Sequence, residues 1–187
     1  MIMKKVFLLS NSEKSINLIK NLLEDYGFED VKSAMSLEAA ENILKDDEFD
    51  LIVINSPLAD GTGADLAAEA VSRSMVQVIF ISGAEDIPAL CTCGVFVIKK
   101  PFGVKEFRRT LKSATVAYNR MRMLYDANSR LMRQMEEIKL INRAKAILIK
   151  TFGMSENEAH RYIERQAMDL RKTKRYVAEK ILSTYEM

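Results

Sequence analysis

The sequence predicts a doubly wound α/β domain with a five-stranded parallel sheet, followed by a long coiled-coil helix and a small C-terminal three-helix unit. Three observations lead to this prediction. Short β-branched runs alternate with amphipathic segments up to about residue 102, the central runs lack polar alternation, and the chain beyond contains no proline and only two glycines. Strands that alternate with helices favour a parallel sheet with crossover helices on both faces, where the strands are covered on both sides.

The elements of the first half follow in chain order. Strands are expected at 6–9, 31–34, 51–54, 78–81 and 95–98, and helices at 15–27, 36–46 and near 65–72. Short polar turns join these segments. Because ligands of such folds bind at the carboxyl ends of the strands, the residues just after each strand are the first candidates for a functional site.

Composition excludes several classes of protein. The chain has 187 residues, of which 48% are hydrophobic and 29% charged, the balance of an ordinary folded protein of one or two domains. It has no apolar stretch long enough for a membrane span or a signal peptide, so no membrane partner and a cytoplasmic location are expected. Cys91, Cys93 and the single His160 cannot form a disulfide framework or a four-ligand zinc site. No metal or other cofactor is expected, and the two cysteines are predicted to be small buried thiols.

Charge divides the chain in two. Residues 1–104 hold 9 Lys and Arg against 16 Asp and Glu, while residues 105–187 hold 19 against 10. Such a split indicates two functional parts, of which the basic one faces a polyanion or an acidic partner. The predicted organisation is a core at 1–104, a long helix at 105–142 and a C-terminal domain at 143–187.

The long helix, expected over 105–150, has apolar residues at heptad spacing. The seam begins weakly at Ala114 and Ala117 and is then formed by Met121, Leu124, Asn128, Leu131, Met135 and Ile138. A buried asparagine in such a seam specifies register and strand number at a cost in stability. The pattern predicts a parallel homodimer, and the alternative is a long surface helix packed on its own domain.

Two short helices complete the C-terminal part. Ser155 and Glu158 have the spacing of a capping box, which predicts a helix from about 155 to 169. Thr173 can cap a last helix with Val177, Ile181 and Leu182 on one face. We expect Ala144, Ala159, Ala167 and Val177 in the core of this unit and His160 on its surface, without a catalytic role. Met168 is also expected in the core, and contact with an RNA base is its alternative.

The first half resembles the receiver domain of two-component response regulators over roughly residues 4–120. The resemblance lies in the strand order, the Asp60-Gly61 loop, the Ser82-Gly83 step and Lys100-Pro101-Phe102. Compared with that family, the stretch from Ser82 to Gly94 is short, so its fourth helix should be truncated.

The family's catalytic acids are replaced in this sequence. The family needs an acid pair after the first strand to bind magnesium and an aspartate after the third strand to accept a phosphoryl group; these positions match Ser10 and Asn11, and Asn55. Magnesium requires hard anionic oxygens, and a neutral amide cannot form an acyl phosphate. Ser82 and Lys100 match the switch hydroxyl and lysine. The resemblance therefore implies a pseudo-receiver, which leaves a regulatory protein, a ligand in the degenerate pocket or constitutive activity as its mode of control.

The C-terminal part resembles the ANTAR domain over about residues 135–183. The matching residues are Arg143-Ala144-Lys145, Ile147-Leu148, Gly153-Met154-Ser155-Glu156, Glu158-Ala159, Gln166-Ala167-Met168 and Val177-Ala178. Ala146 and the segment Ile163-Glu164-Arg165 depart from the family pattern.

This second resemblance implies binding to paired stem-loops in nascent messenger RNA, where hairpin folding competes with a transcription terminator. Residues 140–187 hold ten Lys and Arg against six acids, which can neutralise phosphates, while the loop bases of a hairpin are open to side chains. The candidate contacts are Arg143, Lys145, Lys150, Arg165, Gln166, Lys172 and Lys174. The alternative for each of them is a solvated basic face.

Two other functions fit parts of the sequence. A helix-turn-helix DNA-binding regulator would explain a basic, dimeric helical end, but its last helix should carry several base-reading polar residues after a tight turn. A protein-binding adaptor would need no net positive charge there. An enzyme is not expected, because the sequence shows no activated nucleophile, no metal-ligand cluster and no phosphate-binding glycine loop.

Overall fold

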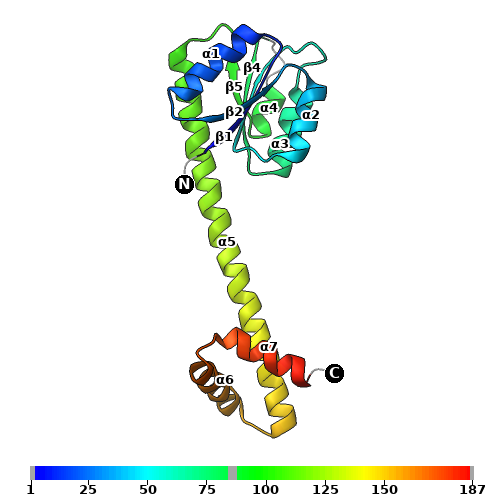
Figure 1. The fold of residues 1–187 in the computed structure, drawn as a ribbon, viewed down its shortest axis with the longest axis vertical. Coiled ribbons are helices and arrows are strands. Elements are labelled where there is room, and N and C mark those ends of the chain that lie inside the picture. The colour runs from blue at the N-terminus through cyan, green and yellow to red at the C-terminus, as the bar shows by residue number, and fades with distance from the viewer. Residues whose placement is uncertain (1–2, 84–87, 186–187) are drawn as a thin grey trace. The chain divides into compact units, whose positions relative to one another are not determined.

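The structure, a computed structural model, describes residues 3–83 and 88–185 (Figure 1). The chain forms two compact units, Met1–Leu124 and Tyr125–Met187. Unit 1 contains a parallel sheet with strand order β2-β1-β3-β4-β5, made of β1 (Lys5–Ser10), β2 (Asp30–Ala34), β3 (Leu51–Asn55), β4 (Gln77–Ser82) and β5 (Phe96–Lys99). The predicted fold class of a five-stranded parallel α/β sheet is confirmed.

Helices cover both faces of this sheet, as the ribbon shows (Figure 1). One face packs against α1 (Glu13–Glu24) and the first turns of α5 (Val104–Phe152). The other packs against α2 (Leu37–Asp46), α3 (Ala64–Arg73) and α4 (Pro88–Thr92). Successive strand residues point to opposite faces, so Val6 and Leu8 of β1 enter the first core while Phe7 and Leu9 enter the second. The unbroken apolar runs in the sequence reflect this two-sided burial.

The loop after β3 is fixed by a carboxylate and a glycine. Asp60 Oδ2 accepts hydrogen bonds from the backbone nitrogens of Leu37 at 2.7 Å and Glu38 at 3.2 Å, at the start of α2. These bonds lower the pKa of Asp60. Gly63 precedes α3 with φ +77°, and a Cβ there would lie 3.0 Å from Ile54 Cγ2. A side chain would therefore strain the backbone and crowd the end of β3.

The segment before β5 is short, as expected. Its helix α4 comprises five residues, and residues 84–87 of the 82–94 stretch lie outside the described part of the chain. The prediction that Cys91 and Cys93 are buried is wrong, because both side chains are exposed. Leu90 of this short helix packs on the sheet, while Cys91 and Cys93 face solvent.

Helix α5 begins within the core of unit 1. Phe107, Leu111, Ala114 and Tyr118 recur every three or four residues and are all buried against the sheet. Ala114, at which the heptad pattern was expected to begin, therefore packs inside its own unit. The Tyr118 hydroxyl donates a short hydrogen bond to Asp50 Oδ1. The helix is longer by a few residues than the predicted span of 105–150.

Unit 2 is built from the carboxyl end of α5 together with α6 (Glu156–Leu170) and α7 (Lys174–Tyr185). The predicted core residues of this unit are buried except one: Ala144, Ala159, Ala167 and Val177 are buried, as are Ile163, Ile181 and Leu182. Met168 is 76% exposed, so its assignment to the core is wrong. Ala159, Ile163 and Ala167 form the inward stripe of α6, and the next residue turns about 100° away from it.

The ends of the two short helices are capped as their sequence predicts. Ser155 Oγ accepts from the Glu158 backbone nitrogen at 3.3 Å, and Glu158 Oε2 accepts from the Ser155 backbone nitrogen at 2.8 Å, which completes the capping box. Thr173 Oγ1 accepts from the Tyr176 nitrogen at 3.2 Å at the start of α7. Between the helices, Arg171 has a left-handed backbone conformation with φ 51°. In the described part of the chain, no helix is both long and apolar enough to cross a membrane.

Candidate functional site

The carboxyl edge of the sheet carries amide and hydroxyl groups. Ser10 ends β1, Asn55 ends β3, and the parallel register places these two residues opposite each other. Asn55 Nδ2 donates a 3.0 Å hydrogen bond to Ser10 Oγ, and both side chains are buried. Asn55 Oδ1 is buried and accepts no hydrogen bond from the described residues. Asn11 follows Ser10 directly and is exposed.

Ser82 and Lys100 lie on the Asn55 side of this pair, at the end of β4 and directly after β5. Ser82 is buried, and its carbonyl accepts a 2.9 Å hydrogen bond from the Lys100 backbone nitrogen. Lys100 Nζ donates a 2.6 Å hydrogen bond to the carbonyl of Ser56, the residue after Asn55. Burial lowers the pKa of the Lys100 ammonium. The structure thus brings Ser10, Asn55, Ser82 and Lys100 to one edge of the sheet, as their positions after successive strands predict.

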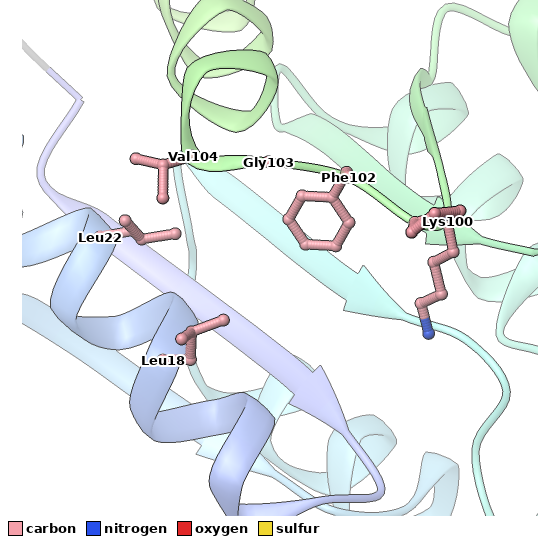
Figure 2. Close-up of a pocket in the computed structure, with 7 residues that line it drawn as sticks. Leu18, Leu22, Lys100, Phe102, Gly103 and Val104 are labelled. Carbon is pink, nitrogen blue, oxygen red and sulfur yellow. The ribbon is translucent and has the colours of Figure 1, made fainter.

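An apolar groove adjoins Lys100 on the side of α1. Figure 2 shows Leu18 and Leu22 of α1 facing Phe102 and Gly103, which lie between β5 and α5, and Val104, the first residue of α5. Lys100 lines the same groove and directs its ammonium toward the loop after β3 (Figure 2).

The chemistry available at this edge is that of neutral donors and acceptors with one ammonium group. Within residues 3–83 and 88–185, no group of three or more His, Cys, Asp or Glu side chains is placed to hold a metal ion. Magnesium is bound through carboxylates, and Ser10 and Asn55 supply none. The residues present do not fit a magnesium ion, and the Asn55 amide cannot take up a phosphoryl group.

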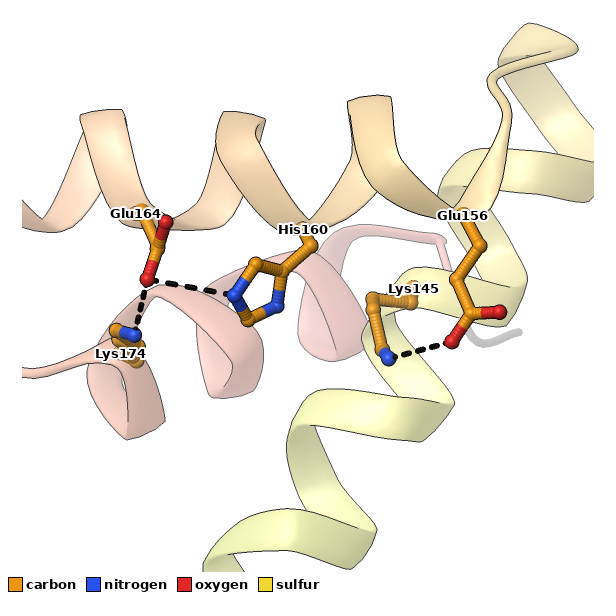
Figure 3. Close-up of polar contacts among 5 residues, drawn as sticks. All are labelled: Lys145, Glu156, His160, Glu164 and Lys174. Carbon is orange, nitrogen blue, oxygen red and sulfur yellow. Dashed lines mark hydrogen bonds and ion pairs between the residues drawn. The ribbon is translucent and has the colours of Figure 1, made fainter.

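The candidate RNA contacts of unit 2 fall into two groups by their partners in the chain. Lys145 Nζ lies 3.1 Å from Glu156 Oε1, and Lys174 pairs with Glu164, to which His160 Nε2 also lies within 3.3 Å (Figure 3). The hydrogen bond from Lys174 lowers the pKa of Glu164. These two lysines are therefore already opposite a carboxylate. His160 is a surface residue, as predicted.

The second group lacks an acidic partner. Lys150, Arg165 and Lys172 are exposed, and no acid of the described chain forms an ion pair with any of them. Lys172 Nζ instead lies 5.8 Å from the ring centroid of Tyr176. Of the candidates outside these two groups, Arg143 is exposed, and Gln166 is uncharged and half-buried beside the inward stripe of α6. A cation without an acidic neighbour attracts a polyanion more strongly, because no carboxylate of the protein offsets its charge.

Two features of unit 2 were missed in the sequence. Arg161 and Arg171 are exposed and also lack an acidic partner in the described chain, although neither was among the candidates. Helical spacing places Arg161, Arg165 and Met168 in one outward row of α6, opposite the buried stripe. A helical projection of 156–170 centred on Ile163 would have revealed this row.

The predicted dimer seam is exposed on α5. Five large apolar side chains of the seam are exposed to solvent: Met121, Leu124, Leu131, Met135 and Ile138. Asn128, which lies between them, is also exposed. Leu124 has the greatest exposed fraction of these five, 70%. The first two predicted seam positions pack within unit 1 and are not free to pair with a second chain, because Ala114 is buried and Ala117 is half-buried there.

Comparisons with known proteins identify both units. The response regulator receiver domain family matches residues 6–112, and the ANTAR domain family matches residues 129–182. The transcriptional regulatory protein PdtaR of Mycobacterium tuberculosis is 26% identical over 187 residues, a match that covers 95% of this chain and 89% of that protein.

Solved structures agree in fold. The low-resolution structure of the response regulator StyR covers 98% of this chain and 100% of its own, with TM-score 0.66 and 15% identity. The receiver domain dimer of beryllofluoride-activated NtrC4 covers 62% of this chain and 99% of its own, with TM-score 0.55 and 28% identity. Because the receiver match alone spans more than half of the sequence, this chain belongs to the response regulator receiver family, and it carries an ANTAR domain after its receiver domain.

Proposed function

We propose that this protein is a transcription antitermination regulator that binds paired hairpins in nascent messenger RNA leaders as a coiled-coil dimer. The observation that carries the proposal is the ANTAR match over residues 129–182, in a unit whose exposed cations outnumber its acids. Residues 125–187 hold 13 Lys and Arg against 9 Asp and Glu. A small basic helical unit with unpaired cations suits a polyanion. Such a function is exercised where transcription occurs, which in a bacterium is the cytoplasm.

The charges that support RNA binding are fewer than the sequence suggests. Six of the 19 basic residues counted after residue 104 belong to the stretch 105–124, at the start of α5 in unit 1. In unit 2, Lys145 and Lys174 are already opposite Glu156 and Glu164. We therefore assign the main phosphate contacts to cations without acidic partners, such as Lys150 and Arg165. Lys145, Lys174, Arg143 and Gln166 are assigned a secondary role.

The receiver domain is proposed to act without phosphorylation. Its three acid positions are Ser10, Asn11 and Asn55, and Asn55 is bonded to Ser10 inside the sheet edge. Without a nucleophilic carboxylate the domain cannot store a phosphoryl group, so we assign its control to a bound regulatory protein or ligand, and constitutive activity is the alternative. The apolar groove of Leu18, Leu22, Phe102 and Val104 beside Lys100 offers such an input a surface.

The homodimer is proposed to form through α5 between Met121 and Ile138. Five large apolar side chains at heptad spacing would otherwise stay in water, and the Asn128 amides of two parallel helices could bond to each other. A dimer would present two copies of unit 2 to one RNA molecule. Linking two binding sites makes the second contact intramolecular and raises avidity without new contacts.

The test is a titration of the full chain with labelled RNA. The probe is a tandem-hairpin RNA that the wild-type chain selects from a pool with randomised loop bases, compared with each hairpin alone, a loop-changed version and a version with swapped stem pairs. We expect the tandem RNA to bind much more tightly than one hairpin, because avidity requires both. Loop changes should weaken binding, while stem swaps should have little effect, because the A-form major groove hides stem bases.

Salt dependence and a duplex control separate the alternatives. The RNA affinity should fall as the salt concentration in the assay rises from about 50 to about 200 mM. Lysine and arginine side chains that neutralise phosphates release counterions, and added salt opposes that release. A duplex DNA of equal length should compete poorly. Tighter binding to the duplex would favour the helix-turn-helix alternative, and the absence of any selected RNA would favour the protein-binding adaptor.

A further inference from the structure

The turn between α6 and α7 gathers an exposed aromatic ring, an exposed thioether and two cations, Met168, Arg171, Lys172 and Tyr176, which we name the α6–α7 corner. Backbone hydrogen bonds hold its residues together: Arg171 N donates to Met168 O at 3.0 Å, and Lys172 N donates to Ala167 O at 2.9 Å. Tyr176 is fixed at the start of α7, since its backbone nitrogen donates to Thr173 Oγ1 at 3.2 Å. These bonds hold the backbone of the corner in one conformation.

The side chains of the α6–α7 corner are open to solvent. Met168 is 76% and Tyr176 45% exposed. The Lys172 ammonium lies 5.8 Å from the Tyr176 ring centroid, within the range of a cation–π contact. Neither Arg171 nor Lys172 forms an ion pair with an acid of the described chain. The corner thus presents a flat π surface with positive charge beside it.

Arg171 occupies a backbone position that favours a different residue. Its φ of 51° is left-handed, and it is the only described residue other than glycine with a positive φ. Helices commonly end with glycine in this conformation, because a Cβ is disfavoured there. Arg171 accepts the strain of a Cβ in this conformation, although its exposed side chain contributes nothing to the core. A functional role of the guanidinium group would explain an arginine at this position.

The chemistry of the corner fits an unpaired nucleotide better than it fits other partners. A partner recognised only through its phosphates would need the cations but not the exposed ring. An apolar protein partner would not suit the positive charge. Residues 165–176 hold five Lys and Arg against one acid, Asp169. Unpaired bases of RNA loops stack on aromatic side chains and on arginine planes, while nearby cations neutralise their phosphates.

We propose that the α6–α7 corner stacks one unpaired loop base of each hairpin on the Tyr176 ring, with Arg171 and Lys172 on the adjoining phosphates and Met168 against the edge of the base. The inference rests on the proposed RNA-binding function and assigns it a contact surface. Of the corner's side chains, only Lys172 was expected from the sequence to contact RNA, and for Met168 contact with a base was the alternative to burial.

The experiment uses the full chain and the tandem-hairpin RNA selected by the wild type, with 2-aminopurine placed at each loop position in turn. Stacking on a tyrosine ring quenches this fluorescent base, so quenching identifies the stacked position. The variants are Tyr176→Ala and Tyr176→Leu, which lose the ring, and Tyr176→Phe, which keeps it. Tyr185→Ala is the matched control, because Tyr185 lies on the same helix with a similar exposed fraction of 47%.

We expect Tyr176→Ala and Tyr176→Leu to weaken binding by roughly tenfold and to abolish quenching at one loop position. Tyr176→Phe should keep both properties within about threefold, since its ring still stacks. Arg171→Ala and Lys172→Ala should each weaken binding to every loop sequence and reduce the salt slope by about one unit. Far-UV circular dichroism confirms that each variant keeps its helices, and because Tyr176 is exposed no loss of fold is expected.

The outcomes separate this inference from the function on which it rests. If no RNA is selected by the wild type, the proposed function and the corner assignment are both wrong. If the wild type binds its selected RNA and Tyr176→Leu binds equally well with quenching intact, only the corner assignment is overturned. Equal losses for Tyr176→Leu and Tyr185→Ala would likewise overturn it, because the effect would then not be specific to the corner.

Discussion

Removing the Tyr118 hydroxyl should lower the free energy of unfolding of unit 1 by about 2 kcal/mol. Asp50 Oδ2 accepts hydrogen bonds from the backbone nitrogens of Lys4 at 2.7 Å and Lys5 at 3.1 Å, and its Oδ1 accepts from Tyr118. Tyr118 is only 5% exposed. Its bond to a carboxylate therefore belongs to the class worth about 1.5–3 kcal/mol. Tyr118→Phe removes that bond and keeps the ring in the core.

The assay is urea unfolding followed by circular dichroism, with Tyr125→Phe as the control. Tyr125 lies seven residues further along α5, is 58% exposed and makes no hydrogen bond through its hydroxyl in the described chain. We expect no change for the control and a lower midpoint for Tyr118→Phe. A loss of about 2 kcal/mol corresponds to a Tm lower by roughly 4–8 °C for a chain of this size.

The pH dependence gives an independent check. Burial raises the pKa of Asp50, but hydrogen bonds from Tyr118 and from the Lys4 and Lys5 nitrogens outweigh it, and the net direction is down. A lowered native pKa adds stability above the unfolded pKa, and that stability is lost as pH falls through the native value. The gap between wild type and Tyr118→Phe should therefore narrow in acid.

A double-mutant cycle with Asp50→Asn isolates the pair. The two single changes should be less than additive, because each removes the same hydrogen bond. A Tyr118→Phe variant as stable as Tyr125→Phe, or fully additive losses, would show that this bond does not hold α5 to the sheet.

Four further outcomes are expected. Acetyl phosphate with magnesium should leave the intact mass of the protein unchanged, and a stoichiometric phosphoryl adduct would contradict the pseudo-receiver. Leu124→Glu with Leu131→Glu should yield monomers in light scattering, and an unchanged dimer mass would place the contact elsewhere. Ser155→Ala should destabilise unit 2 by about 1 kcal/mol in thermal unfolding, because the Glu158 nitrogen loses its acceptor. Lys150→Ala should reduce the salt slope of RNA binding by about one unit. Lys145→Ala should reduce it less, because Lys145 already pairs with Glu156. A larger effect of Lys145→Ala would contradict the assignment of the main phosphate contacts to cations without an acidic partner.

The fold could be predicted because its signals are local. The apolar runs of the strands and the Ser155–Glu158 spacing are determined by a few neighbouring residues, and the structure agrees with them to within about two residues. The positions at the carboxyl edge also followed from topology, since Ser10 and Asn55 must meet wherever two parallel strands pair in register. The domain boundaries at 104 and 142 and the seam on α5 stay predictions.

Exposure of single residues was harder to predict. Met168 is apolar and adjoins the inward-facing Ala167, yet one residue of helical rotation puts it in solvent. Cys91 and Cys93 are of a type that is usually buried, but both side chains are exposed at the end of a helix of five residues. The ion pairs of Lys145 and Lys174 join different helices, so no local pattern reveals which cations are already neutralised. Tertiary contacts decide this last case, whereas a helical projection of α6 would have placed Met168 on the outward face.

The hydrogen bond between Asn55 and Ser10 has a consequence for how the carboxyl edge responds to solution conditions. A cluster of carboxylates repels itself until a divalent cation arrives, so its resting structure depends on the metal concentration. Here the two strand ends attract each other through a neutral amide and a hydroxyl. Such an edge is already at its preferred spacing in the absence of any ion. We expect the melting temperature of unit 1 to be the same in millimolar magnesium and in chelator, which makes the domain a constant scaffold across changing ionic conditions.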